Sequence, residues 1–144
     1  EEVGYNSRLD ALQAAILQAK LPHVDSWNEK RRAIAGRYSE QLARLGITIP
    51  VECDWGRHVY HLYIIRSDRR DELQAFLKQK GIASEVYYPL PPHLSTPCRK
   101  LGYHEGNFSH AERASHETVA LPLYPELTEG QQEEVIAAVS EFVG

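Results

Sequence analysis

The strongest constraint on the fold of this chain is one run of strand-forming residues at 58–66, with the sequence HVYHLYIIR. β-Branched and aromatic side chains dominate the run, which predicts a β-strand rather than a helix. Because side chains alternate between the two faces of a strand, His61 is expected to share a face with Tyr63, opposite His58. The two histidines therefore cannot hold one metal ion. We expect this strand to lie at the centre of a small sheet.

Two helices are predicted ahead of this strand, each with apolar residues at three- and four-residue intervals. The first runs from about Arg8 to Lys20, and the second follows Pro22, a residue that the first turn of a helix tolerates. The expected buried stripe of the first helix is Leu9, Leu12, Ile16 and Ala19. The expected inner side of the second is Val24, Trp27, Ile34, Tyr38, Leu42 and Leu45. Gly46 followed by the apolar Ile47 is typical of a left-handed glycine cap, so we expect the second helix to end there.

A third helix is predicted directly after the strand. We expect Asp68 to cap a helix from about Arg69 to Lys80, and Gly81 to end it in the same way as the helix before. Its expected inner side is Leu73, Phe76 and Leu77. A second short strand is then predicted over residues 83–88.

Two capping boxes, each a hydroxyl residue followed three positions later by Glu or Gln, predict two further helix starts. Ser109 with Glu112 is expected to open a helix ahead of a short strand at 119–121, and Thr128 with Gln131 to open the C-terminal helix. The inward residues of the last helix are expected to be Val135, Val139 and Phe142. Together these elements predict an α+β domain, in which two N-terminal helices precede a small, mostly antiparallel sheet of about three strands packed with helices.

Composition and charge exclude several functional classes. The 16 Lys and Arg against 20 Asp and Glu give a formal net charge of -4, and no basic tract is present to follow a nucleic-acid backbone. No run of about 18 apolar residues could span a bilayer, and the first residues do not resemble a signal peptide, so we expect a cytoplasmic protein with no membrane partner. Cys53 and Cys98 have no metal-ligand spacing and are expected to be free thiols, and we expect no metal site.

The turn that leads into the first helix carries an amide and a guanidinium, on Asn6 and Arg8. Both side chains can donate hydrogen bonds to a phosphate or a carboxylate, and the amides of a helix start add to that field. One interpretation is therefore an anion site. The alternative is structural, because Asn6 and Ser7 are common helix-capping residues and Arg8 can pair with Asp10 or with a neighbouring chain.

A proline-rich loop, PLPPHL at residues 89–94, follows the predicted strand at 83–88. Three prolines fix the backbone φ and remove amide donors, so we expect the loop to be rigid and to hold Tyr88 and His93 in set positions. This makes the loop a candidate site. The alternative for Tyr88 and its neighbour Tyr87 is packing in a core or an interface.

Five blocks of the sequence, in order, resemble the C-terminal part of the DegT/DnrJ/EryC1/StrS sugar aminotransferases. The blocks cover nearly the whole chain and are GYNSRLDALQAAIL, LPHVDSWNEKRRAIAGRYSEQL, HVYHLYIIR, GIASEVYYPLPPHL and ALPLYPELTEGQQEEVIAAV. The resemblance implies the small C-terminal domain of a type I transferase that depends on pyridoxal 5'-phosphate. It also implies transfer of an amino group from glutamate to a nucleotide-linked keto-sugar, as in amino-sugar biosynthesis for cell-surface polysaccharides.

The resemblance further implies that residues 1–144 form a single C-terminal domain of a longer protein. Residues 1–46 are then a helical pair that links to a large cofactor-binding domain, and residues 47–144 a small α/β sheet domain. In the family, the lysine that binds the cofactor belongs to the large domain, and no lysine of this chain stands in the corresponding context. We therefore expect no catalytic residue here, no activity from the chain alone, and an exposed apolar patch where the large domain packs.

Cofactor-binding residues are assigned from the family position by position. In the family, the N-x-R turn crosses the interface of a homodimer, and its asparagine donates to the cofactor phosphate of the partner subunit. The resemblance therefore assigns cofactor binding to Asn6 and, with it, Arg8. The chemistry fits, since amide and guanidinium donors can anchor the phosphate while the other end of the cofactor reacts.

Substrate-binding residues follow in the same way. Tyr88 and His93 fall where a loop of the family lines the sugar-nucleotide pocket, although Tyr87 stands where histidine is common. His61 resembles a recurrent strand histidine of the family. For His61, a substrate contact and a buried structural role are both left open.

Two alternatives to an aminotransferase also follow from the sequence. A few relatives in the family carry histidine in place of the cofactor-binding lysine and act as keto-sugar dehydratases. The other alternative is a non-catalytic module that holds an anionic ligand or a protein partner with the Asn6/Arg8 turn or the proline-rich loop.

Overall fold

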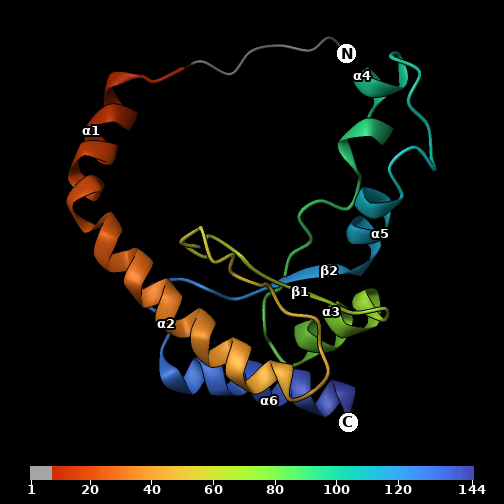
Figure 1. The fold of residues 1–144 in the computed structure, drawn as a ribbon. Helices are drawn as coiled ribbons and strands as arrows, with labels where there is room; N and C mark the ends of the chain where they lie inside the picture. The colour runs from red at the N-terminus through yellow and green to blue at the C-terminus, as the bar shows by residue number, and fades with distance from the viewer. Residues whose placement is uncertain (1–7) are drawn as a thin grey trace.

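A two-stranded antiparallel sheet lies at the centre of the computed structural model, which describes residues 8–144 (Figure 1). Strand β1 (Tyr63–Arg66) pairs with β2 (Thr118–Leu121) along its whole length, so that the first residue of β1 lies opposite the last residue of β2. Helices surround this sheet. The predicted α+β class is confirmed.

The sheet is smaller than predicted. Of the run at 58–66, only the last four residues form a strand, because Tyr60 has a positive φ of 46° and its backbone N–H donates to Nδ1 of His58 at 2.8 Å. The predicted strand at 83–88 is reduced to one bridge, in which Glu85 pairs with Ala120 of β2. The described residues thus contain two strands with isolated bridges at their outer edges, not three strands.

Helices make up most of the remaining regular structure. They are α1 (Ala11–Lys20), the 3-10 helix η1 (Leu21–His23), α2 (Val24–Ala43), α3 (Arg70–Gln79), the 3-10 helix η2 (Pro92–Leu94), α4 (Thr96–Arg99), α5 (Ser109–Glu117) and α6 (Glu129–Val143). Helix α6 packs against both α2 and α3, and α3 also contacts β2. These elements form what we call the base of the molecule, namely β1, β2, α3, α6 and the C-terminal half of α2 (Figure 1).

The hydrophobic core lies within the base. Its largest fully buried side chains are Tyr38, Tyr63, Leu42, Ile65, Leu73, Leu77, Val119 and Val139. The two buried tyrosines have hydrogen-bond partners, because the Tyr38 hydroxyl donates to the Pro122 carbonyl at 3.0 Å and the Tyr63 hydroxyl lies 3.0 Å from Oγ of Ser39. Burial raises the pKa of both phenols, so both stay neutral and satisfied in the core.

Several helix ends agree with the sequence. Gly46 and Gly81, with φ of 73° and 76°, lie in the left-handed region just after α2 and α3. The predicted capping box of α6 is complete, since Oγ1 of Thr128 accepts the Gln131 N–H at 3.3 Å and Oε1 of Gln131 accepts the Thr128 N–H at 3.0 Å. Glycine and the Thr128 box therefore specify these ends locally.

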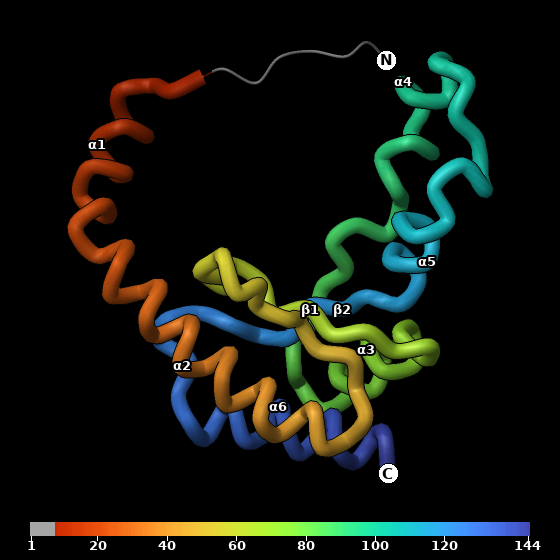
Figure 2. Tube along the Cα trace, in the orientation of Figure 1, coloured from red at the N-terminus to blue at the C-terminus, as the bar shows by residue number. Residues whose placement is uncertain are grey.

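Two further details of the helices differ from prediction. Arg69 rather than Asp68 is the N-cap of α3, because Oγ of Ser67 accepts the Arg69 N–H at 3.2 Å and Asp68 stays exposed. In α2, the C-terminal half of the predicted inner side is buried, whereas Val24 is exposed. The start of this helix extends beyond the sheet (Figure 2).

Helix α1 begins later than predicted and is not buried. Asp10 is its N-cap, with Oδ1 accepting the Gln13 N–H at 2.9 Å, so Arg8 and Leu9 precede the helix. No residue of α1 is buried, and Leu12 is 72% exposed. The predicted burial of this stripe is therefore wrong within residues 8–144, and the expected apolar patch is present.

Two arms rise from the base on opposite sides (Figure 2). The first arm comprises residues 8–24, with α1, and the second comprises residues 87–116, with α4 and most of α5. Large apolar side chains are exposed on both. They are Leu9, Leu12, Ile16, Leu17, Leu21 and Val24 on the first arm, and Tyr87, Tyr88, Leu90, Leu101, Tyr103 and Phe108 on the second. Such a concentration of exposed apolar side chains marks a surface that binds something.

Candidate functional site

The proline-rich loop starts the second arm and presents a pair of aromatic rings. Tyr88 is 70% exposed, and its ring lies edge-on to that of Tyr87, with the ring centroids 5.8 Å apart. Between these rings and α5 lies a groove of about 270 Å³, whose apolar walls include Pro91 and Ala114. Packing of the two tyrosines in the core of this chain is therefore wrong, and the loop offers an aromatic surface to a partner or ligand.

His93 is buried at the end of the same loop, with only 8% of its surface exposed. Its Nε2 lies 2.9 Å from Oε1 of Glu112, and its ring packs edge-on against Phe108, with the centroids 4.9 Å apart. Nδ1 of His93 has no hydrogen-bond partner among the described residues. The imidazole is thus held through one nitrogen only.

Glu112, on α5, is the centre of this cluster. Its carboxylate also accepts the backbone N–H groups of Gly106 at 2.9 Å and Phe108 at 3.2 Å. These donors, the Gly106 N–H above all, hold the pKa of Glu112 below its ordinary value of about 4.5, so that it is a carboxylate at neutral pH. The predicted Ser109 cap is wrong, because Phe108 is the N-cap and Ser109 is already the first helical residue.

His61 is exposed in the turn just before β1. Burial of His61 in the core of this chain is therefore wrong. Within residues 8–144, no hydrogen bond or ring contact joins His61, Tyr88 and His93. The structure thus groups Tyr88 and His93 on one loop and leaves His61 on a separate segment.

The N-terminal turn is described only in part. Asn6 lies outside the described residues, so its predicted role is a matter for proposal. Arg8 is exposed, and within the described part of the chain its guanidinium forms no ion pair with Asp10 or with any other carboxylate. A guanidinium in this setting suits a phosphate. The start of α1 adds less than predicted, because the carboxylate of Asp10 already accepts the Gln13 N–H.

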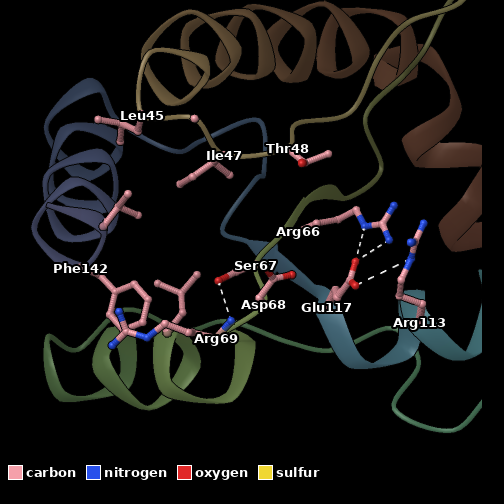
Figure 3. Close-up of a pocket in the computed structure, with 13 residues that line it drawn as sticks. Leu45, Ile47, Thr48, Arg66, Ser67, Asp68, Arg69, Arg113, Glu117 and Phe142 are labelled. Atoms are coloured by element: carbon pink, nitrogen blue, oxygen red, sulfur yellow. Dashed lines mark hydrogen bonds and ion pairs between the residues drawn. The ribbon is translucent and has the colours of Figure 1, made fainter.

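A second cavity, of about 590 Å³, lies on the base away from these residues (Figure 3). Glu117 is its charged centre, because Arg66 donates to it from Nε at 3.0 Å and Arg113 approaches it at 3.8 Å. Arg69 lies over the ring of Phe142, 4.6 Å from the centroid. Sequence reasoning missed this cavity, since its residues come from four separate segments with no shared pattern.

An ion pair that sequence reasoning also missed holds the loop between α2 and β1. Arg32 on α2 contacts Glu52 through two nitrogens, at 2.7 and 3.1 Å, and also donates to the His58 carbonyl at 2.6 Å. The Arg32 hydrogen bonds, with the His58 N–H, lower the pKa of Glu52. The loop displays Trp55, which is almost fully exposed. The partners are too far apart in sequence for any motif to reveal them.

Residues 8–144 contain neither a candidate metal site nor a candidate membrane-spanning helix. No group of three or more His, Cys, Asp or Glu side chains there could hold a metal ion. None of the helices described is both long and apolar enough to cross a membrane. Cys53 and Cys98 are free thiols, as predicted.

Comparison with known proteins supplies what this geometry leaves open. The sequence model of the DegT/DnrJ/EryC1/StrS aminotransferase family matches residues 1–140. A pleiotropic regulatory protein of Geobacillus stearothermophilus is 51% identical over 144 residues, which cover 97% of this chain and 38% of that protein. The dTDP-3-amino-3,4,6-trideoxy-alpha-D-glucose transaminase of Streptomyces venezuelae is 42% identical over 143 residues, covering 99% of this chain and 38% of the enzyme.

Solved structures match the fold closely. DesV of S. venezuelae, solved in complex with a ketimine intermediate, has a TM-score of 0.90 and 42% sequence identity over 99% of this chain and 39% of DesV. NtdA of Bacillus subtilis, with the cofactor PMP bound, has a TM-score of 0.83 and 32% identity over 97% of this chain and 34% of NtdA. This chain thus has the fold of a segment of these aminotransferases, and spans about 38% of the length of the curated relatives it matches.

Proposed function

Because the chain belongs to the DegT/DnrJ/EryC1/StrS aminotransferase family, we propose that it is part of a pyridoxal-phosphate-dependent enzyme that transfers an amino group from glutamate to a nucleotide-linked keto-sugar. The observation that carries this proposal is the match along nearly the whole chain to a dTDP-sugar transaminase, at 42% identity and with a TM-score of 0.90 for the solved DesV structure. A second relative is named as a UDP-sugar aminotransferase, from Acidithiobacillus ferrooxidans. The reaction class is shared, while the sugar differs between relatives.

The chain is proposed to be the C-terminal domain of this enzyme, with residues 1–46 linking to a larger domain and residues 47–144 forming the small sheet domain. The exposed apolar stripe of α1 supports this division, since an amphipathic helix is stable in water when its apolar side is covered. The larger domain supplies the lysine that binds the cofactor. On this proposal the chain alone has no activity.

Cofactor binding is proposed for Asn6 and Arg8. When bound, pyridoxal phosphate supplies an electron sink for amino transfer, and the part of these two residues is to hold its phosphate. The exposed guanidinium of Arg8, which has no carboxylate partner within residues 8–144, fits that part. We further propose that the turn acts across a homodimer interface, on the phosphate held by the partner subunit.

Substrate binding is proposed for Tyr88, His93 and His61. The ring of Tyr88 gives a flat surface on which a sugar or a base can stack, and the apolar groove lies beside it. Nδ1 of His93 is the ring nitrogen that is not bonded to Glu112, and it is the atom proposed to meet the substrate. His61 is exposed and polar, which leaves its imidazole free to contact a ligand. A cytoplasmic location and a part in cell-surface polysaccharide synthesis complete the proposal.

The test is turnover by the full-length protein. Glutamate and a panel of dTDP- and UDP-linked keto-sugars are supplied, and the products are weighed by mass spectrometry. We expect an amino group in place of the keto oxygen of one substrate. A dehydrated sugar without nitrogen would instead identify a dehydratase, and retention of no pyridoxal phosphate by the intact protein would overturn the proposal.

Substitutions within residues 1–144 test whether these residues bind the nucleotide sugar. Tyr88→Ala is expected to raise the KM for the nucleotide sugar about tenfold or more, since stacking on an aromatic ring contributes about 1–3 kcal/mol. The matched control is Trp55→Ala, because Trp55 is also an exposed aromatic residue but lies on the loop between α2 and β1. Equal kinetic effects of the two substitutions would remove Tyr88 from the site.

A further inference from the structure

Glu112 is a charged residue of the second arm to which the sequence assigned only a helix cap. It is half-buried, and each of its oxygens accepts a hydrogen bond. The donors come from three places along the chain, namely the His93 ring at the end of the proline-rich loop and the backbone of Gly106 and Phe108 in the turn before α5. One carboxylate therefore connects the proline-rich loop to the turn and to α5.

The protonation of this cluster determines which nitrogen of His93 carries hydrogen. Its donors hold the pKa of Glu112 low, so at neutral pH both carboxylate oxygens can only accept hydrogen bonds. The Nε2 atom, 2.9 Å from Oε1, must then be the donor. In the neutral imidazole this leaves Nδ1 without hydrogen, as an acceptor.

We propose that Glu112 is a positioning residue of the candidate substrate site, which fixes His93 in the Nε2–H form and so presents Nδ1 as a hydrogen-bond acceptor for a hydroxyl group. The inference rests on the proposed function, because it takes the proline-rich loop as the sugar-binding loop. A sugar hydroxyl can donate to such an acceptor, whereas a carbonyl or an ether oxygen at the same place cannot. Glu112 thus selects the chemistry of the group that meets His93.

The surroundings of His93 make this orientation firm. The ring of Phe108 packs edge-on against the imidazole at 4.9 Å between centroids, and the backbone N–H of Phe108 is itself held by Glu112. Tyr103 in turn packs against Phe108, with the centroids 5.5 Å apart. The ring is therefore held by the contact with Phe108 and by a hydrogen bond at Nε2, so that a flip of the imidazole would cost the hydrogen bond and a rotation out of its plane would cost both.

The first experiment is carried out on the 144-residue chain and is independent of any catalysis. Nitrogen-15 NMR of the histidine rings reports which nitrogen of His93 carries hydrogen at neutral pH. We expect the Nε2–H form to account for nearly all of the neutral imidazole. A predominant Nδ1–H form would overturn the proposal without any substitution, so a variant that fails to fold does not leave the question open.

Substitution of Glu112 extends this NMR experiment. Glu112→Gln introduces an amide that can also donate, so we expect the preference for Nε2–H to be lost and the amides of Gly106 and Phe108 to exchange faster. Glu112→Asp retains the charge and is expected to restore part of the preference. The matched control is Glu105→Gln, because the Glu105 side chain has no hydrogen-bond partner among the described residues. An unchanged fraction of the Nε2–H form of His93 in Glu112→Gln would contradict the inference.

The second experiment uses the full-length enzyme. It separates a role of Glu112 in positioning His93 from a general effect on stability. For Glu112→Gln we expect the KM for the nucleotide sugar to rise about tenfold, the scale of one lost hydrogen bond, while the KM for glutamate and kcat change less than about twofold. A uniform loss of kcat with unchanged KM would argue against this role. If the full-length protein turns over no nucleotide sugar, the proposed function fails. The nitrogen-15 NMR of the His93 ring still decides whether Glu112 fixes the Nε2–H form.

Discussion

The base and the first arm contain similar helical sequences with opposite surroundings. In the base, Leu73 and Leu77 of α3 are fully buried, whereas Leu12 and Leu21 of the first arm are 72% and 70% exposed. In both helices the predicted inner side has apolar residues three and four positions apart. This spacing therefore specifies a helix with an apolar side but not the partner that covers it. An apolar side left open in a well-formed helix therefore indicates an interface.

The largest expected effect contrasts two leucines in these regions. Leu77→Ala removes a fully buried side chain and is expected to lower the free energy of unfolding by about 2–5 kcal/mol. Leu12→Ala, the matched substitution on α1, is expected to change it by less than about 0.5 kcal/mol. Urea unfolding at low protein concentration measures both. Similar losses for the two variants would show that α1 is packed in solution.

Self-association tests whether the open side of α1 binds a partner surface. We expect the 144-residue chain to associate at high concentration, and Leu12→Gln with Ile16→Gln to weaken that association at least about tenfold, since each apolar side chain contributes about 1.5–3 kcal/mol when fully buried. Gln18→Ala is the control on the same helix. Sedimentation equilibrium gives the dissociation constants. A wild-type chain that stays monomeric would count against an interface on the first arm.

The N-caps of α6 and α1 are expected to contribute differently to global stability. Thr128→Ala removes the cap of α6 and is expected to lower the free energy of unfolding by about 1 kcal/mol, because α6 is part of the core. Asp10→Ala removes the cap of α1 and is expected to leave global unfolding unchanged while speeding amide exchange within α1. Hydrogen exchange with urea unfolding separates these outcomes. A global loss from Asp10→Ala would mean that α1 unfolds together with the base.

The smallest expected effect concerns the ion pair that holds the loop between α2 and β1. The pKa of Glu52 is lowered in the folded chain, chiefly by its hydrogen bond with Arg32, so its stabilisation is present above about pH 4.5 and is lost as the pH falls through the lowered pKa. Glu52→Gln should therefore be less stable than wild type at neutral pH and converge with it in acid. Glu133→Gln, at a more exposed pair with Arg37, is the control. A stability difference that is unchanged by acid would contradict this assignment.

Local signals in the sequence predicted much of the base. The caps at Gly46, Gly81 and Thr128 and the strand at 119–121 depend on neighbouring residues, and the structure confirms them. The run at 58–66 was overestimated because the turn at Tyr60 depends on contacts that spacing does not show.

The candidate site was less predictable for the same reason. The proline-rich loop could be expected from local chemistry, whereas the sequence left packing of Tyr88 in a core open. The bond between His93 and Glu112 joins positions 19 apart in sequence, and the pair of Arg32 with Glu52 joins positions 20 apart. Neither spacing forms a motif. Such contacts become visible only once the fold brings the segments together.

On the proposed function, this chain completes the cofactor site of a sugar aminotransferase through its N-terminal turn. The most direct measurement is the affinity of the intact protein for pyridoxal phosphate before and after Asn6→Ala with Arg8→Ala, with Arg44→Ala, at an exposed pair on the base, as the control. We predict a loss of about a hundredfold or more for the double variant, the scale of two hydrogen bonds to a charged phosphate, and no change for the control. An unchanged affinity in the double variant would contradict the account.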